Sequence, residues 1–416
     1  MSYLSAVFEY LLNGRSLVCI LAMVVTAPYS GAHAYLVLKP ELSTRNSYDD
    51  NPRLRLQNTN ALVFTSNELV VDSTFVSPTY QIGITPTFRL SRFTEETELN
   101  SEEYLVSTFA TKLFQRHQLG ATFDFAREAS FVTEVDDSGI FDINLFRTTL
   151  SGQINWSYYL SERVTLSFNG YATDVSFEED PRSFFVDYFL YGAGASVRYD
   201  YSETTSFWVI FNRADFKTPA LSSETGSYIF QVGFDHELTE TVDVSFRIGR
   251  NRSNLEFKQA RLAFLSLNPP VLGTVLGDEE ENASGDVIQA TVEKKFARAS
   301  LTMQWDRRFS PSSQGVRQEI EEVSGYLRYR VARHVSLVGR VNFRNQLQEG
   351  TLITTRVPEL EILQYEAKLF YRVSPSLRAE LGYRYRDQTS TRQAEGAESH
   401  RVFVGLRFSP AEMRFW

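Results

Sequence analysis

The sequence predicts an all-β protein, a transmembrane antiparallel up-and-down β-barrel of about 18 strands. Three observations predict this class: an export signal at the N-terminus, long segments in which apolar and polar residues alternate, and an unusual composition. Aromatic residues make up 14% of the chain, with 32 Phe and 21 Tyr, although the mean hydropathy is only −0.25. This combination is expected when one side of every strand faces lipid and the other side faces water.

The first 34 residues have the pattern of a secretory signal peptide. Arg15 precedes the apolar run 17–25, which is followed by the small-x-small tripeptide Ala32-His33-Ala34. A basic flank, a short apolar core and such a tripeptide define a cleavable export signal. We predict that residues 1–34 are removed and that the mature chain begins at Tyr35. The alternative, a membrane anchor, is disfavoured because a spanning helix needs about 20 apolar residues.

The strands are predicted from segments in which every second residue is apolar. In 378–386, Ala, Leu and Tyr occupy one face, whereas Arg, Glu and Gly occupy the other. The same period of two is found in 189–199, 242–249, 335–344 and 402–408. A soluble β-sandwich also alternates, but its strands usually have about 5–6 residues. The longer segments of this chain, roughly 10–15 residues each, favour a membrane-spanning barrel.

Short turns alternate with longer polar connections, as in a barrel with a periplasmic and an extracellular end. We predict short turns near 115–118, 161–163, 202–204, 239–241, 297–298, 332–334 and 374–376, and longer connections at 131–146, 178–185, 218–225, 257–283 and 351–356. Counting strands from Tyr80 gives 16, and pairing 36–45 with 61–71 gives 18. Residues 35–78 are then the first hairpin, or a periplasmic extension, of a barrel at 35–416. We favour 18 strands, with 16 as the alternative.

The C-terminus ends on an aromatic residue, as the chains that the barrel-assembly machinery recognises often do. Residues 402–408 alternate and close on Phe408, but a further segment, 409–416, follows them. Either Phe408 is the recognised residue and the tail is free, or the last strand continues through an irregularity at Pro410.

Enzymatic and metal chemistry is not predicted. Cys19 lies inside the signal peptide, so the mature chain would contain no cysteine for disulfides, thiolate catalysis or metal binding. The histidines outside the signal peptide belong to no nucleophile–base set. They are His117, His236, His334 and His400. The acidic groups at 48–51 and 278–282 lack EF-hand spacing. We therefore predict no enzyme, no cofactor and no metal site.

Charge is unevenly distributed and points to the lumen. The chain carries a formal net charge of −9, yet the segment 285–416 contains 21 basic and 15 acidic residues and is net +6. Arginine outnumbers lysine 35 to 7. Many arginines occupy the polar face of predicted strands. They include Arg247 and the candidate lumen track Arg328, Arg330, Arg340, Arg344, Arg372, Arg378, Arg384, Arg386 and Arg407. Guanidinium groups bind carboxylates and phosphates in a forked geometry. The alternative is structural, because lumen arginines also pair with lumen acids such as Glu293, Glu366 and Glu380.

Three short motifs are similar to those of a known family. They are Ser47-Tyr48-Asp49-Asp50-Asn51, Ile84-Thr85-Pro86-Thr87-Phe88-Arg89-Leu90 and Arg401-Val402-Phe403-Val404-Gly405-Leu406-Arg407-Phe408. Together with the overall layout of the mature chain, they resemble the β-barrel porin type 2 family, whose members often accompany exopolysaccharide biosynthesis and export. The resemblance implies a polysaccharide-associated channel of the outer membrane.

The function expected from these features is a porin-like channel that serves exopolysaccharide export. A general diffusion porin for small solutes and a plugged barrel with a structural or binding role at the surface remain alternatives. The expected partners are outer-membrane lipids and lipopolysaccharide, the barrel-assembly machinery, an anionic polysaccharide and periplasmic export components. No nucleic-acid partner is expected.

Overall fold

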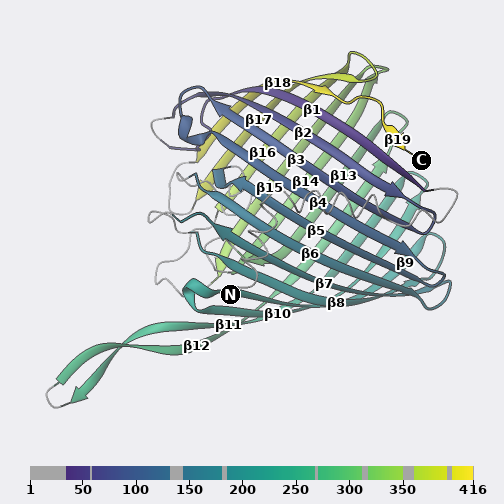
Figure 1. Cartoon of the computed structure of the whole chain (residues 1–416). Helices are drawn as coiled ribbons and strands as arrows, with labels where there is room; N and C mark the ends of the chain where they lie inside the picture. The colour runs from purple at the N-terminus through teal and green to yellow at the C-terminus, as the bar shows by residue number, and fades with distance from the viewer. Residues whose placement is uncertain are drawn as a thin grey trace.

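The chain forms a barrel of 18 long antiparallel strands, with a short nineteenth strand at the C-terminus (Figure 1). The structure, a computed structural model, describes residues 34–56, 59–131, 144–179, 185–267, 270–311, 317–349, 360–390 and 396–415. Side chains are excluded from this description at 257–267, 270–281, 311, 317 and 348–349. Most of the predicted signal peptide lies outside these residues, so its cleavage stays a prediction.

The strands follow one another around the barrel. They are β1 (Tyr35–Asp49), β2 (Leu62–Val76), β3 (Tyr80–Phe93), β4 (Ser101–Leu113), β5 (His117–Ala129), β6 (Phe146–Tyr159), β7 (Val164–Phe177), β8 (Tyr188–Asp200), β9 (Thr205–Thr218), β10 (Ser223–Thr239), β11 (Val242–Leu267), β12 (Pro270–Lys295), β13 (Ala299–Pro311), β14 (Arg317–Ala332), β15 (Val335–Glu349), β16 (Leu360–Arg372), β17 (Leu377–Ser390), β18 (Ala397–Phe408) and β19 (Met413–Phe415). Short 3-10 turns occur at η1 (Thr97–Leu99) and η2 (Pro219–Leu221). No helix within the described ranges is both long enough and apolar enough to span a bilayer.

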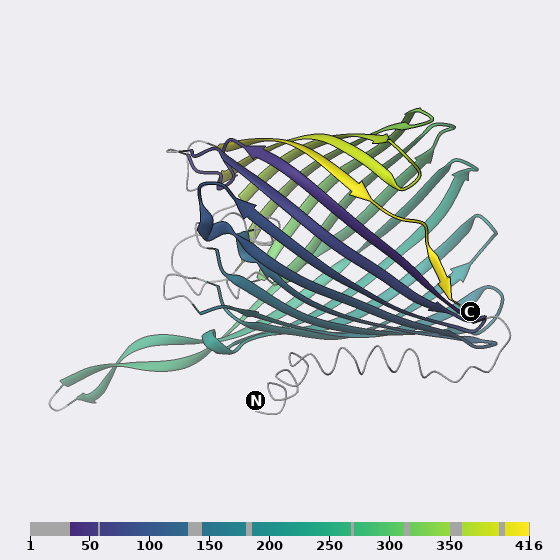
Figure 2. The ribbon, with the colours of Figure 1, turned by 45° about the horizontal axis from the view of Figure 1, so that its top comes forward.

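Closure comes from pairing of the first and last long strands. β1 pairs with β2 on one side, from Tyr35 opposite Val76 to Asp49 opposite Leu62, and with β18 on the other side. In Figure 2 the early, purple to blue strands lie at the front and green strands lie behind them, while the yellow C-terminal strand runs beside the purple first strand. The prediction of an up-and-down barrel with 18 strands is confirmed, and the alternative of 16 is wrong. The first hairpin of the barrel is β1–β2.

The C-terminal tail continues the closing seam after a break. β18 pairs with Leu42 to Asp49 of β1, and β19 pairs with Leu36 to Leu38. Continuing the β18 register would place Pro410 opposite Pro40, and neither proline can donate a backbone hydrogen bond. The ladder therefore breaks there and resumes shifted by one residue. Of the two predicted alternatives, the strand that continues through an irregularity is the one observed.

The two ends of the barrel differ as predicted. The connections β4–β5, β6–β7, β8–β9, β10–β11, β12–β13, β14–β15 and β16–β17 are all short and lie at one end. We call this the short-turn end and the opposite one the long-loop end. One predicted loop is wrong: within 257–283 the backbone of β11 and β12 stays paired up to Leu267 opposite Pro270, as a ribbon that projects beyond the barrel (Figure 1). Residues 260–276 show no regular alternation of apolar and polar residues, so no strand period is visible, whereas an antiparallel ladder needs only backbone partners.

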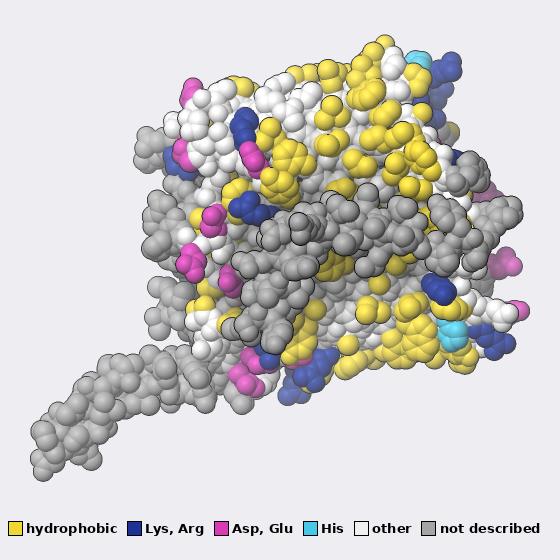
Figure 3. Space-filling model, in the orientation of Figure 1, with side chains coloured by type: hydrophobic (Ala, Val, Ile, Leu, Met, Phe, Trp, Pro, Cys, Tyr) yellow, Lys and Arg dark blue, Asp and Glu magenta, His cyan; other side chains and the backbone are white. Residues whose placement is uncertain are grey.

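Burial is inverted relative to a soluble protein. Large apolar side chains are exposed on the outer surface, for example Ile154, Leu381 and Val404, whereas Asp49 and Glu103 are almost completely buried on the inner side. Yellow apolar side chains cover much of the visible wall in Figure 3, and charged ones gather towards its ends. Closed strands with an apolar outer face are the surface of a transmembrane β-barrel. Every second side chain therefore faces the lumen.

Candidate functional site

The candidate site is the inner wall of the barrel, where the predicted arginine track lies. Leu327 and Tyr329 of β14 are exposed on the outer surface, so their neighbours Arg328 and Arg330 face the lumen. The same parity applies to β15, β16, β17 and β18, whose exposed residues include Val341, Leu369, Leu381 and Leu406. It places all nine predicted arginines on the inner face.

Seven arginines gather at the short-turn end around one cavity of about 520 Å³. The cavity is formed by β13 to β18 with the β12–β13 and β14–β15 turns, and no Asp or Glu among the described residues lines it. We call this group the arginine mouth. Its members are Arg298, Arg328, Arg330, Arg333, Arg372, Arg378 and Arg407. Five of them belong to the predicted track, so the fold concentrates these five at one end of the barrel.

Three members of the arginine mouth lie directly opposite one another on adjacent strands. Arg378 of β17 is paired in register with Arg372 of β16 and with Arg407 of β18. Like charges facing each other across a sheet are destabilising. Arg407 reaches a carboxylate oxygen of Glu41 at 3.1 Å. Within the described residues, Arg372 and Arg378 have no carboxylate partner. Two of the three guanidinium groups in this row therefore lack a described protein anion, and the third is paired with Glu41.

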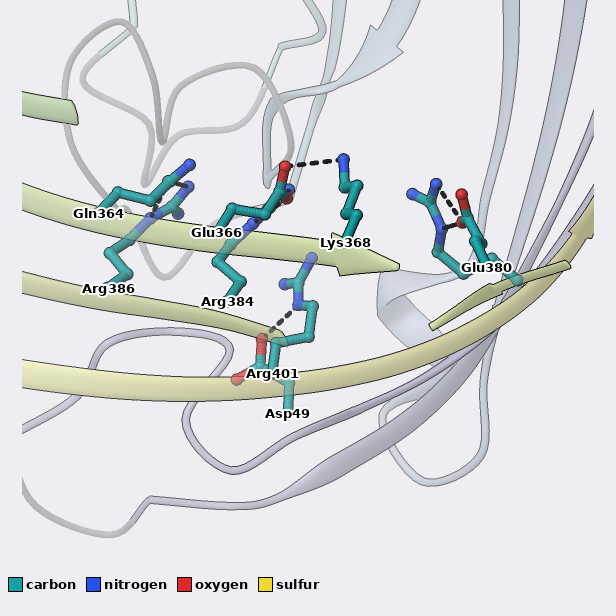
Figure 4. A network of polar contacts seen from close by, with 9 residues as sticks. Asp49, Gln364, Glu366, Lys368, Glu380, Arg384, Arg386 and Arg401 are labelled. Atoms are coloured by element: carbon teal, nitrogen blue, oxygen red, sulfur yellow. Dashed lines mark hydrogen bonds and ion pairs between the residues drawn. The ribbon is translucent and has the colours of Figure 1, made fainter. Parts of the chain in front are cut away.

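Nearer the long-loop end, the same strands carry arginines that are ion-paired (Figure 4). Glu366 of β16 accepts from Arg384 at 2.6 Å and from Lys368 at 2.7 Å, and its side chain is only 4% exposed. Arg401 of β18 donates to the buried Asp49 at 2.7 Å. These contacts cross-link β1, β16, β17 and β18. Buried carboxylates that satisfy two strands act as structural ties.

The remaining predicted arginines differ in the side chain that each one contacts. Arg344 contacts Glu322 at 3.2 Å, and Arg386 donates to Gln364 at 2.8 Å. Arg340 stacks over the ring of Tyr326, 5.9 Å from its centre. The structural alternative thus describes Arg344, Arg384 and Arg386, whereas six of the seven arginines of the arginine mouth have no carboxylate partner among the described residues.

The inner wall formed by β8 to β12 is acidic at the short-turn end. A cavity of about 310 Å³ is lined by six carboxylates and by one arginine, Arg198. We call this group the acidic wall. The carboxylates are Asp200, Glu203, Asp235, Glu237, Asp243 and Glu293. The cations near it are already paired: Arg198 with Asp200 at 2.8 Å, Arg247 with Asp235 at 3.3 Å and Lys295 with Asp243 at 2.9 Å. Arg247 is therefore part of a structural pair.

The sequence did not indicate Arg298 and Arg333 or the acidic wall. Arg298 and Arg333 lie in turns, where the strand alternation that selected the other arginines ends. A usable signal was present, because the short turns predicted at 297–298 and 332–334 contain these two residues and bring their charges to the short-turn end. The acidic wall would have required knowing which strands are neighbours across the barrel.

Other candidate chemistry is absent from the described residues. His236 contacts the hydroxyl of Thr205 at 2.9 Å, and His400 contacts that of Tyr383 at 2.8 Å. Asp49 accepts hydrogen bonds from Ser399 and Arg401. The acidic group at 48–51 therefore has a structural role at this corner of the barrel. No set of three potential metal ligands is found within the described ranges. The side chains of 278–281 lie outside the description.

Comparison with known proteins gives distant structural matches. No protein-family model matches the chain, and no curated protein matches its sequence. The resemblance to the β-barrel porin type 2 family therefore stays a prediction. Similar solved structures include the ferric-catecholate import receptor Fiu from E. coli K12, with 8% identity and a TM-score of 0.47, covering 89% of this chain and 81% of that chain. OccK2 (OpdF) of Pseudomonas aeruginosa has 10% identity and a TM-score of 0.44, covering 89% and 98%. OccAB2 of Acinetobacter baumannii has 12% identity and a TM-score of 0.44, covering 91% and 98%.

Proposed function

We propose that this chain is a porin-like channel of the outer membrane that conducts anionic polysaccharide out of the periplasm. The arginine mouth carries the proposal: seven guanidinium groups surround one cavity, no described Asp or Glu lines it, and Arg407 is the one member paired with a described carboxylate. In barrels of this kind the short turns face the periplasm. The cationic cavity would then meet an exported chain as it enters the lumen.

The chemistry of arginine suits an acidic glycan. Each guanidinium offers several donors in a planar fork that matches a carboxylate, and it stays charged at any relevant pH. Within a narrow, low-dielectric wall, fixed charges attract counter-ions more strongly than on an open surface. Exposed arginines without ion-pair partners, such as Arg330 and Arg378, are available for this role. A row of such groups would let successive acidic sugars exchange partners without tight binding.

The acidic wall favours a second candidate within the same class. Opposite charges on two parts of one mouth would create a field across it, which also suits a general diffusion porin for small polar solutes. The proposals differ in ligand size: a polysaccharide channel is blocked by a long acidic chain, whereas a diffusion porin mainly sorts small ions. A plugged structural barrel would conduct neither.

Planar-bilayer recordings at low salt test the proposal, because low salt keeps the fixed charges unscreened. We expect anion-selective conductance and block by an oligogalacturonate added on the short-turn side, but no block by a neutral oligosaccharide of equal length. Cation selectivity would contradict the role of the arginine mouth. Selective anion conductance without oligogalacturonate block would favour the diffusion porin, and an absence of conductance would favour the plugged barrel.

A further inference from the structure

We infer that the outer surface of β9–β12 binds the phosphate groups of a phosphorylated glycolipid of the outer leaflet, namely the lipid A portion of lipopolysaccharide. This site lies on the face of the sheet opposite to the lumen. It requires that the barrel is embedded in an outer membrane, and it does not depend on what passes through the channel.

The site begins where the apolar outer surface ends. One cross-strand row contains only apolar side chains, Val209, Val232, Ile248 and Ile288. The next row towards the long-loop end contains Phe211, Phe230, Arg250 and Asp286, and the row after it contains Arg213, Tyr228, Arg252 and Ser284. The change from apolar to charged therefore falls within a level two rows deep, at Arg250 and Asp286 on β11 and β12 and one row later at Arg213 on β9. Such a level is where the lipid chains end and the headgroups begin.

A groove of about 570 Å³ lies at this level. Phe211, Tyr228 and Phe230 supply exposed aromatic surface, and Arg250 and Arg252 supply the charge. The groove therefore offers an apolar floor and two guanidinium groups to the same ligand. Aromatic side chains with one polar end are typical of membrane interfaces.

The two arginines are not committed to protein carboxylates. Arg250 donates to the hydroxyl of Ser284 at 3.2 Å, and no carboxylate within the described residues contacts Arg250 or Arg252. Other outward-facing cations near this level are neutralised: Arg213 pairs with Asp215 at 3.2 Å, and Lys217 pairs with Glu224 at 2.9 Å. Asp286 lies opposite Arg250 in register but forms no ion pair with it.

Phosphate is the ligand group that this arrangement fits. Two adjacent guanidinium groups with free donors bind phosphate oxygens through forked, charge-assisted hydrogen bonds. At the edge of the lipid band, the phosphate must belong to a molecule whose acyl chains cover the apolar rows below. The long-loop end is the extracellular end of the barrel. The phosphate carrier of that leaflet is lipid A, and its sugar rings would rest on the aromatic floor.

Binding of purified lipid A to the folded barrel in detergent tests this inference, with native mass spectrometry as the readout. The R250Q/R252Q variant should lose at least about tenfold in lipid A affinity, since charge-assisted hydrogen bonds are among the stronger polar contacts. R250K/R252K should retain part of the affinity. R307Q is the matched control, because Arg307 belongs to neighbouring β13 and already donates to Glu319 at 2.6 Å.

Each outcome decides the inference. Lipid A binding that is unchanged in R250Q/R252Q, or equally weakened in R307Q, would overturn it. So would equal binding of dephosphorylated lipid A, because the phosphates would then be irrelevant. Binding of inorganic phosphate at millimolar concentration without any lipid A binding would show a free-anion site and would also overturn it. Boiling-sensitive gel mobility shows that each variant is folded, and bilayer conductance separates this result from a failure of the proposed channel.

Discussion

Arg378 and Arg384 belong to the same strand, β17, and face the same lumen, yet their surroundings differ. Arg384 donates to Glu366, which is buried and shared with Lys368. Arg378 lies between Arg372 and Arg407 and has no carboxylate partner within the described residues. The number of arginines in a strand therefore says little about their role. The position of each arginine along its strand decides whether it links neighbouring strands through an ion pair or faces a ligand.

The same comparison extends around the short-turn end. The arginine mouth and the acidic wall both lie there, but the acidic wall holds its few cations in ion pairs. Its carboxylates Glu203 and Glu237 have no side-chain partner among the described residues. Uncompensated charge of either sign thus occurs at this end, whereas in the network of Figure 4 Arg384 and Lys368 are paired with Glu366 and Arg401 is paired with Asp49. Substitutions at both kinds of position test this division between charges that link strands and charges without a described partner.

The largest effect is expected from removing a buried carboxylate that links two strands. In E366Q, the amide oxygen cannot neutralise Arg384 and Lys368, so two lumen cations lose their shared anion. We expect the free energy of unfolding to fall by about 3 kcal/mol, the cost of breaking a buried ion pair. The urea midpoint of unfolding from lipid vesicles measures this. E203Q, which removes a turn carboxylate without a partner, is the control, and an equal loss in both variants would refute the structural role of Glu366.

Removing charges that have no carboxylate partner should change selectivity without lowering stability. In R328Q/R330Q/R372Q/R378Q, we expect the anion-to-cation permeability ratio to fall roughly tenfold, or about 1.4 kcal/mol spread over four charges. Reversal potentials across a salt gradient at low ionic strength provide the measurement. R250Q/R252Q removes arginines from the outer surface only and should conduct like the wild type. If the quadruple variant kept its anion preference, the arginine mouth would not control the pore.

Much of the fold could be predicted because its signal is local. The period of two identifies strands such as 378–386 from their own residues, and the spacing of turns gives their number. The ribbon of β11 and β12 was missed because residues 260–276 carry no regular alternation of apolar and polar residues. The seam at Pro40 and Pro410 needed the register of β1 with β18, which relates the two ends of the chain.

The site could be predicted only in part, for a related physical reason. Alternation shows that Arg372 and Arg384 belong to the polar face of their strands. Whether each finds a carboxylate depends on register between strands, which a single strand does not reveal. Glu366 pairs with Arg384 because the β16–β17 ladder sets them opposite each other. The lipid-facing Arg250 and Arg252 were likewise hidden, because an outward arginine looks like an interruption of the apolar face.

A smaller effect of opposite sign is expected within the arginine mouth. In R378Q, the central charge of the row with Arg372 and Arg407 is removed. We expect the free energy of unfolding to rise by about 0.5 kcal/mol, since like charges across a sheet are destabilising. The same urea experiment measures it, at low salt to keep the repulsion unscreened. R384Q should move the midpoint in the opposite direction. A fall in stability for R378Q would mean that this guanidinium is tied to a group of the protein.

The smallest effect should come from the acidic wall. Glu203 lies in the β8–β9 turn and Glu237 near the end of β10, and both line the acidic cavity without a side-chain partner in the described part of the chain. Their charges repel anions that approach the mouth, but water and salt screen them across the width of the lumen. In E203Q/E237Q we expect the anion-to-cation permeability ratio to rise by less than about twofold, or a few tenths of a kcal/mol. The charge-preserving E203D/E237D should leave the ratio unchanged.

A rise as large as the fall produced by the quadruple arginine variant would show that both walls control selectivity equally. The channel would then sort solutes by a field across its mouth, as a diffusion porin does, and the arginine mouth would lose its special role for an acidic polysaccharide.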